Sequence, residues 1–180
     1  MHPRLAEIAA FLEETRAAVV RAVEGLSPEN AARRPAADTW SVDEILTHLS
    51  LVETGVTKRF VQSVGQAKGE GLARESAVES VMHALDGRSV DVVREKWVAP
   101  EFVEPKTGLV LPDALDALAR SRSGLRLALA DADGWALQLV VSPNPRLGPL
   151  DMYQWLLFLG QHERRHLTQI ERTIAAVAGI

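Results

Sequence analysis

The sequence predicts an all-α fold, a four-helix bundle that forms a single domain over residues 1–180. Four long stretches repeat apolar residues at steps of three and four, the spacing that gives a helix one apolar face. Glycine and proline cluster between these stretches, where the chain has to turn. With 180 residues, of which 47% are hydrophobic, the chain is long enough to bury a full core.

The first predicted helix covers about residues 3–24. Pro3 suits a first helical turn, and Gly25 lies where this helix would end. Its inward stripe consists of Leu5, Ile8, Leu12, Thr15, Val19, Ala22 and Leu26. From Ser27 to Asp38, prolines and small polar residues predict turn and loop.

The second helix is predicted to begin at Ser41. Ser41 and Glu44 have the spacing of a capping box, and Trp40 before the cap would pack on Ile45. The inward stripe then consists of Ile45, His48, Val52, Val56 and Phe60. His48 therefore points toward the predicted core.

A long connection over residues 65–111 follows, punctuated by glycines and prolines. Its length predicts a crossover between the second and third helices. We expect a short helix over residues 75–86, a further turn over residues 90–97 and an extended run over residues 99–105. Long loops in compact domains are often functional, so this segment is a candidate wall or lid of a substrate pocket. A plain structural crossover is the alternative.

The third helix is predicted to begin at Pro112 and to end near residues 131–134. Residues 135–141 favour a strand, but the run is short. The prolines in residues 142–149 are expected to stop it.

The fourth helix is predicted over residues 151–176, where Asp151 and Gln154 repeat the capping-box spacing. Its inward stripe consists of Met152, Trp155, Leu159, His162, His166, Ile170 and Ile174. His162 and His166 are one turn apart on the same face of the helix. They are therefore close enough to hold a single metal ion.

His48, His162 and His166 are the predicted metal ligands. Burying three imidazoles without partners would cost on the order of 1–3 kcal/mol each, whereas one divalent ion satisfies all three. The chain has no cysteine, so histidine and carboxylate are the ligand types left. The alternative is a set of hydrogen-bonded core histidines. His2 and His83 are not expected to bind metal.

Residues 162–166 also match His-Glu-x-x-His, the pattern of zinc metalloproteases. A protease would need a third ligand downstream, but Glu171 lies about 140° round the helix from His166 and cannot join the pair. A metalloprotease is therefore the least favoured alternative. Glu163 is the candidate catalytic residue, as a general base or as a residue that orients a ligand. The competing interpretation makes Glu163 a solvated charge paired with Arg164 or Arg165.

Three further polar residues lie on the two helices that carry the histidines. Glu44 is expected to be occupied by the helix cap. Glu53 and Gln169 are candidates to orient the ligands without touching the ion.

The charge pattern argues against nucleic acid as a partner. The net charge is −4 and the isoelectric point is near 5.7, and no cluster of Lys and Arg is interleaved with aromatic residues. The longest apolar run, residues 155–159, is too short to cross a membrane, and the first residues lack the apolar core of a signal peptide. We therefore expect a cytoplasmic protein without a membrane partner.

Three segments resemble the DinB-like (YfiT-like) superfamily of metal-dependent enzymes. They are residues 40–49 (W-S-V-D-E-I-L-T-H-L), 147–150 (L-G-P-L) and 162–170 (H-E-R-R-H-L-T-Q-I). The resemblance covers nearly the whole chain. It implies a four-helix bundle with up-down-down-up topology and a divalent ion held by three histidines, which correspond to His48, His162 and His166. It also implies that a homodimer is common.

Assigned activities in this superfamily include thiol S-transferases that use low-molecular-weight thiols such as bacillithiol or mycothiol, and a mycothiol-dependent maleylpyruvate isomerase. We therefore expect a metal-dependent enzyme, a thiol-dependent S-transferase or a hydrolase, acting on a small molecule. Zinc or nickel is the first expectation for the metal, and iron or manganese the second. A non-catalytic metal- or ligand-binding bundle is the alternative.

Overall fold

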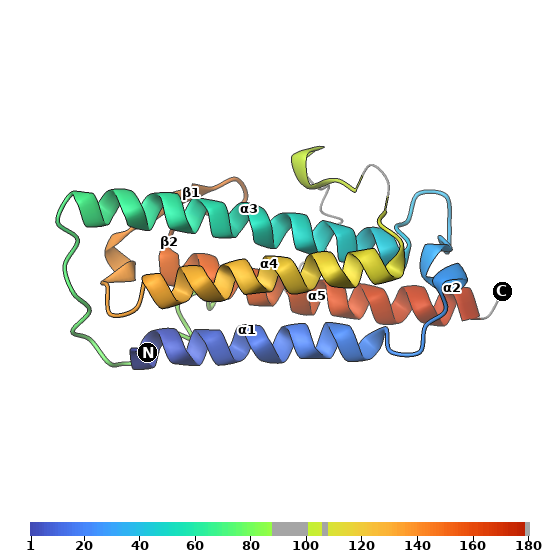
Figure 1. The fold of residues 1–180 in the computed structure, drawn as a ribbon, viewed down its shortest axis with the longest axis horizontal. Helices are drawn as coiled ribbons and strands as arrows, with labels where there is room; N and C mark the ends of the chain where they lie inside the picture. The colour runs from blue at the N-terminus through green and yellow to red at the C-terminus, as the bar shows by residue number, and fades with distance from the viewer. Residues whose placement is uncertain (88–100, 106–107, 179–180) are drawn as a thin grey trace.

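The computed structural model describes residues 1–87, 101–105 and 108–178, and four long helices dominate them. These helices are α1 (Pro3–Ala22), α3 (Val42–Gly69), α4 (Leu111–Asp131) and α5 (Met152–Ala178). They lie side by side, with α1 and α5 running in one direction and α3 and α4 in the other (Figure 1). The predicted four-helix bundle, its up-down-down-up topology and its long crossover between α3 and α4 are confirmed.

The connector after α1, predicted to be turn and loop, contains the short helix α2 (Pro28–Ala32). Ser27 caps this helix, because its hydroxyl accepts the Asn30 N–H at 3.3 Å. Pro28 occupies a first-turn position, where its missing N–H costs nothing. The same residues that indicated a turn therefore also begin a helix.

Helix α3 begins with the predicted capping box. The Ser41 hydroxyl accepts the Glu44 N–H at 3.3 Å, and the Glu44 carboxylate accepts the Ser41 N–H at 2.8 Å. The helix continues beyond Gly65, where the irregular connection was predicted to begin, because buried Val64 holds this turn against the core. The chain leaves the helix at Gly71, whose φ of +89° favours glycine.

The predicted helix over residues 75–86 is wrong. The Glu75 carboxylate accepts the N–H groups of Ser76 at 3.0 Å and Ala77 at 2.9 Å, and it accepts the Tyr153 hydroxyl at 3.0 Å. These bonds hold the chain in a non-helical path, and residues 82–87 form turns. The turn predicted over residues 90–97 lies outside the described residues. Within the run predicted to be extended, residues 101–103 form the 3₁₀ helix η1 (Glu101–Val103).

The segment before α5 differs most from prediction. After the 3₁₀ helix η2 (Leu137–Leu139), β1 (Val141–Asn144) pairs antiparallel with β2 (Gly148–Asp151). The strand predicted over residues 135–141 is wrong, because η2 occupies the middle of that run and β1 begins only at Val141. The prolines expected to end a strand lie within the ribbon, because a two-stranded ribbon has free edges and Pro143 faces Pro149 without needing a hydrogen bond. The Asn144 side chain accepts the N–H groups of the turn. Two short strands thus precede the last helix.

The core consists of two apolar clusters, separated along the bundle by buried charged residues. Each long helix contributes one of these residues: Arg16 from α1, Glu53 from α3, Arg122 from α4 and Glu163 from α5. We call these four residues the charged layer. Its two guanidinium groups and two carboxylates balance, and each residue is at most 7% exposed. A balanced, hydrogen-bonded set is the form in which charges can be buried.

Candidate metal centre

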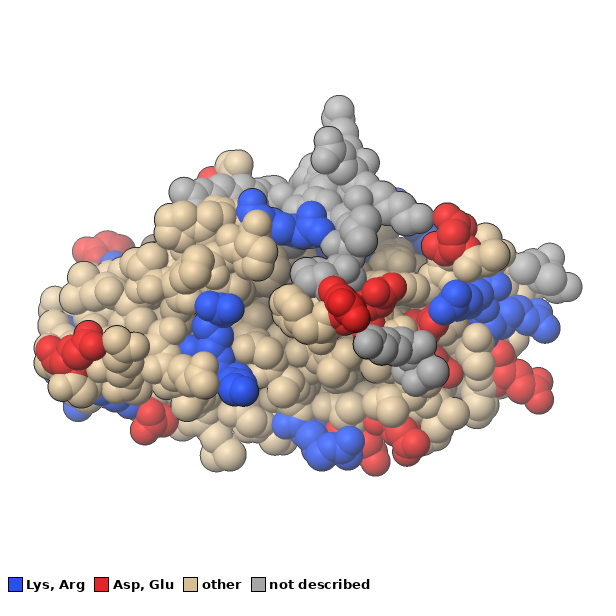
Figure 2. Space-filling model, turned by 90° about the horizontal axis from the view of Figure 1, so that it is seen from above, with Lys and Arg blue, Asp and Glu red and all other residues tan. Residues whose placement is uncertain are grey.

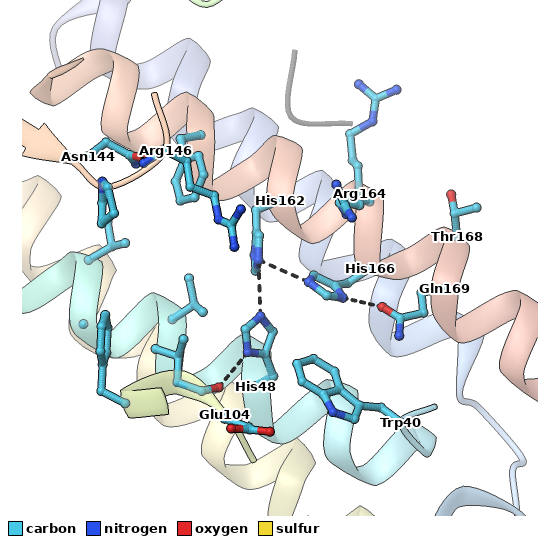
Figure 3. Close-up of a pocket in the computed structure, with 18 of the residues that line it drawn as sticks. Trp40, His48, Glu104, Asn144, Arg146, His162, Arg164, His166, Thr168 and Gln169 are labelled. Atoms are coloured by element: carbon cyan, nitrogen blue, oxygen red, sulfur yellow. Dashed lines mark hydrogen bonds between the residues drawn. The ribbon is translucent and has the colours of Figure 1, made fainter. Parts of the chain in front are cut away.

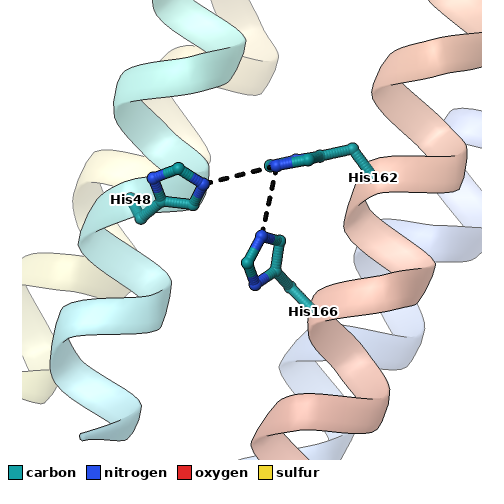
Figure 4. Close-up of side chains that lie close together, drawn as sticks. All are labelled: His48, His162 and His166. Atoms are coloured by element: carbon teal, nitrogen blue, oxygen red, sulfur yellow. Dashed lines mark hydrogen bonds between the residues drawn. The ribbon is translucent and has the colours of Figure 1, made fainter. Parts of the chain in front are cut away.

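The structure brings the three predicted ligands together between α3 and α5. His48 projects from α3, and His162 and His166 project from consecutive turns of α5 (Figure 4). The Nε2 atom of His162 lies 3.3 Å from that of His48 and 3.1 Å from that of His166. All three side chains are buried, and their ligand atoms lie within 4.8 Å of one another.

Two of the imidazoles are held from behind by hydrogen bonds (Figure 3). The Nδ1 atom of His48 lies 2.7 Å from the Val103 carbonyl oxygen, and that of His166 lies 2.8 Å from Oε1 of Gln169. Both oxygen atoms can only accept a hydrogen bond, so the proton of each ring is assigned to its Nδ1 atom. The Nε2 atoms of the neutral His48 and His166 rings therefore carry no proton, and their lone pairs face Nε2 of His162.

Burial keeps the three rings neutral. It lowers the pKa of His48, although the hydrogen bond to Val103 acts in the opposite direction. Burial also lowers the pKa of His162 well below its usual value, with the charges of His166 and His48 adding to the effect. For His166, burial and then the charge of His48 lower the pKa to about 3. Neutral imidazole is the form that binds a metal ion.

The arrangement of nitrogen atoms fits a divalent ion. Metal–nitrogen bonds of about 2.0–2.1 Å in a tetrahedral site place the nitrogen atoms roughly 3.3 Å apart, which is close to the separations of His162 Nε2 from the other two Nε2 atoms, 3.3 and 3.1 Å. Hydrogen bonding alone does not explain the contact, because His162 Nε2 can donate one proton at most and faces two acceptors. An ion bound by these three histidines would keep a further coordination position open, as in catalytic sites.

Glu163 lies in the charged layer and not with the imidazoles. Its carboxylate accepts hydrogen bonds from Thr15 at 2.5 Å, Arg16 at 2.6 Å and Arg122 at 3.1 Å. The residue is 3% exposed, so its interpretation as a solvated surface charge is wrong. Glu53 also belongs to this layer, bonded to both arginines. Glu163 follows His162 directly, so the helix turns it about 100° away from that ring. Nothing local in the sequence indicates its partners on the other helices.

Gln169 and Glu44 occupy the places that the sequence suggested. Gln169 orients His166 from within the same helix. The Glu44 carboxylate is occupied by the Ser41 cap and by Arg34. His2 and His83, expected not to bind metal, lie outside the three-histidine group.

A pocket of about 860 Å³ opens beside the imidazoles. From α3 and α5 its lining includes His48, Val52, Val56, Arg59, Trp155, Phe158, His162 and His166. Residues 102–104 form part of the wall, so the crossover does line the pocket, as predicted. Trp40 packs against the ring of His48 with centroids 5.0 Å apart, and Phe158 stacks on His162 at 5.7 Å. These aromatic walls were not predicted as part of the site, although the sequence placed Trp40 beside a helix cap and Trp155 on an inward stripe.

The fold and the three-histidine site together define a helix-bundle protein with a candidate divalent-metal centre. Residues 12–170 match the DinB superfamily, and the chain belongs to this family. It is 26% identical over 168 residues to YuaE of Bacillus subtilis (strain 168), an uncharacterized protein, and the match covers 89% of this chain and 93% of YuaE. The crystal structure of TT2238, a four-helix bundle protein, superposes with a TM-score of 0.63 at 19% identity, covering 93% of this chain and 98% of the other.

Proposed function

We propose that the protein is a metal-dependent enzyme that acts on a small molecule, as a thiol-dependent S-transferase or a hydrolase. Its divalent ion is held by the Nε2 atoms of His48, His162 and His166. The observation that carries the proposal is the convergence of three neutral imidazoles on one side of a pocket of about 860 Å³. Zinc or nickel suits these ligands best, with iron or manganese as alternatives.

When bound, such an ion supplies Lewis acidity that lowers the pKa of a thiol or a water molecule in the pocket. Val103 and Gln169 fix the rings that would hold the ion, and aromatic side chains line the pocket beside it. In S-transfer the thiol sulfur forms a bond to an electrophilic carbon, the leaving group departs with its bonding electron pair, and the thiol proton goes to solvent. The thiol is a separate small molecule, because the chain has no cysteine.

Two alternatives are weaker. A non-catalytic bundle that holds only a metal ion needs no pocket of this size beside the ion, and a non-catalytic ligand-binding bundle is separated from an enzyme by the turnover test below. A metalloprotease needs a general base next to the metal, and the Glu163 carboxylate is instead bonded to Arg16 and Arg122.

Two further expectations from the sequence, a cytoplasmic location and a homodimer, stay predictions. No helix within the described ranges 1–87, 101–105 and 108–178 is long and apolar enough to cross a membrane.

The test is a turnover screen on metal-loaded protein, chelator-treated protein and the His48→Ala variant. One arm couples a panel of low-molecular-weight thiols, including bacillithiol and mycothiol, to a fluorogenic alkyl halide, and the other follows hydrolysis of p-nitrophenyl esters. We expect turnover in one arm that requires the metal and is lost in His48→Ala, while His83→Ala, at an exposed site, behaves as wild type. Protein that binds metal but turns over nothing in either arm would favour the non-catalytic bundle.

A further inference from the structure

The pocket has the opposite charge to the molecule. The whole chain carries a net charge of −4, yet the described lining residues include five arginines and only two carboxylates. The arginines are Arg59, Arg146, Arg164, Arg165 and Arg172, and the acids are Asp38 and Glu104. Figure 2 shows basic side chains beside the hollow on this face. A concave wall of one charge attracts small ligands of the opposite charge.

Arg59 is held in place by two contacts. One of its guanidinium N–H groups donates to the Ser142 hydroxyl at 2.9 Å, and the guanidinium lies 5.2 Å from the centre of the Trp155 ring. Ser142 is itself fixed, since its carbonyl oxygen accepts the Trp155 indole N–H at 3.2 Å. Among the described residues, no carboxylate forms an ion pair with Arg59. A guanidinium held in this way still has donors to offer a ligand.

The position of Arg59 relates it to the histidines. It lies on the same face of α3 as His48, eleven residues further on, which separates the two Cα atoms by about 16 Å. Val52 and Val56 line the pocket between them, and Phe158 faces this stretch from α5. Along α3 the pocket therefore offers a guanidinium, then an apolar stretch and then an imidazole. In Figure 3, Asn144 and Arg146 lie on one side of the histidines, and Trp40 and Gln169 on the other.

We infer that Arg59 binds the carboxylate or phosphate group of an elongated small-molecule ligand whose other end reaches the three histidines. Charge-assisted bonds to the guanidinium fix the anionic end, and Val52, Val56 and Phe158 contact the apolar body. The claim that the other end of the ligand reaches the three histidines rests on the proposed function. The anion site itself does not require a metal ion.

The first test uses metal-free protein and three six-carbon probes: hexanoate, hexyl phosphate and hexanol. NMR titration measures their weak binding. We expect at least one anion to bind about tenfold more tightly than hexanol, the gain typical of a hydrogen-bonded charge, and Arg59→Gln to remove that preference. The tighter of the two anions identifies the class of group.

The controls separate the site from general effects. Arg120→Gln removes an exposed arginine of α4 outside the pocket and should leave the preference unchanged. Ser142→Ala leaves the charge but removes the hydroxyl that orients Arg59, and should weaken the preference. If the Arg59→Gln protein keeps the anion preference, or wild type binds hexanol as well as the anions, the inference is wrong.

The second test links the two ends with 6-mercaptohexanoate and metal-loaded protein. We expect the thiol to add affinity over hexanoate, and His48→Ala to abolish the added part. A thiol gain without any Arg59-dependent preference would overturn this inference and leave the proposed function standing. An Arg59-dependent preference without a thiol gain would overturn the link between the two ends and count against the proposed function.

Discussion

His162 is held differently from the other two histidines. Its Nδ1 atom has no hydrogen-bond partner among the described residues, and its ring stacks on Phe158 instead. His48 and His166 each have an oxygen atom behind the ring. Stacking fixes the plane of a ring but not its protonation state, so the proton of His162 is free to move away from Nε2 when an ion binds.

Gln169→Ala should weaken metal binding without removing it. Its Oε1 atom fixes the proton of His166 on Nδ1, and loss of such a partner typically costs about 10–100-fold in metal affinity. Competition with a chelator of known affinity measures the effect, and Gln66→Ala, at an exposed glutamine of α3, is the matched control. Equal affinities in the Gln169→Ala protein and wild type would show that Gln169 has no part in the site.

The stability of metal-free protein should fall as the pH falls below about 6.5. The folded-state pKa of each buried histidine lies below its unfolded value, so the unfolded state binds more protons in this range and gains stability. Each such histidine contributes up to about 1.4 kcal/mol per pH unit, and for His166 the range extends down to about pH 3. Urea unfolding at several pH values measures the slope. His166→Gln should reduce it, whereas an equal slope in both proteins would contradict the neutral, buried state of the ring.

The convergence of the three candidate ligands could be predicted at the scale of single residues, because helical spacing decides which face each side chain occupies. His48, His162 and His166 all lie on apolar stripes, and the structure places them together. Glu163 could not be placed in the same way. Its burial depends on Arg16 and Arg122, which belong to other helices and have no local signal that connects them to it.

At the scale of helices, the charged layer ties all four long helices at one level of the bundle. Glu163→Gln should lower the free energy of unfolding by about 3–5 kcal/mol, because it removes a negative charge that pairs with the buried guanidinium groups of Arg16 and Arg122. Glu171→Gln, at an exposed position of α5, should change it little. Urea unfolding measures both. A Glu163→Gln protein as stable as wild type would show that the layer adds nothing to stability.

Helices α1 and α5 meet at Gly160. A methyl group there would clash with the ring of Phe11, so Gly160→Ala should destabilise the protein by about 1–3 kcal/mol. Gly124 of α4 has open space around it, and Gly124→Ala should stabilise by roughly 0.5–1 kcal/mol through helix propensity alone. Thermal unfolding compares the two variants. Equal effects would rule out a close approach of α1 and α5 at this glycine.

The long helices followed from periodicity, but the short elements did not. Residues 75–86 contain helix-forming residues, yet the Glu75 carboxylate binds backbone N–H groups and Tyr153 of a distant helix. The β1–β2 ribbon forms despite Pro143 and Pro149, because neither proline has to donate a ladder bond there. Tertiary contacts decide the structure of short segments, and such contacts leave little trace in the local sequence.

For the whole molecule, the three-histidine centre lies where α3 and α5 meet, between residues more than a hundred positions apart in the chain. An ion at this point would bind the folded state and not the unfolded chain. The pocket beside the centre, with its arginine wall, gives the same region a place for a small anionic ligand. Metal binding, ligand binding and stability are therefore expected to depend on the same interface between two helices.

The most direct test of this account is the metal content of untagged protein purified without added metal, measured by elemental analysis alongside His48→Ala. We expect about one divalent ion per chain in the wild-type protein and a large loss in the variant, since His48 supplies the only donor from α3 within the described three-histidine group. The ion should also raise the melting temperature of the wild type and not that of the variant. The same stoichiometric ion in both proteins, or none in either, would contradict a centre built from His48, His162 and His166.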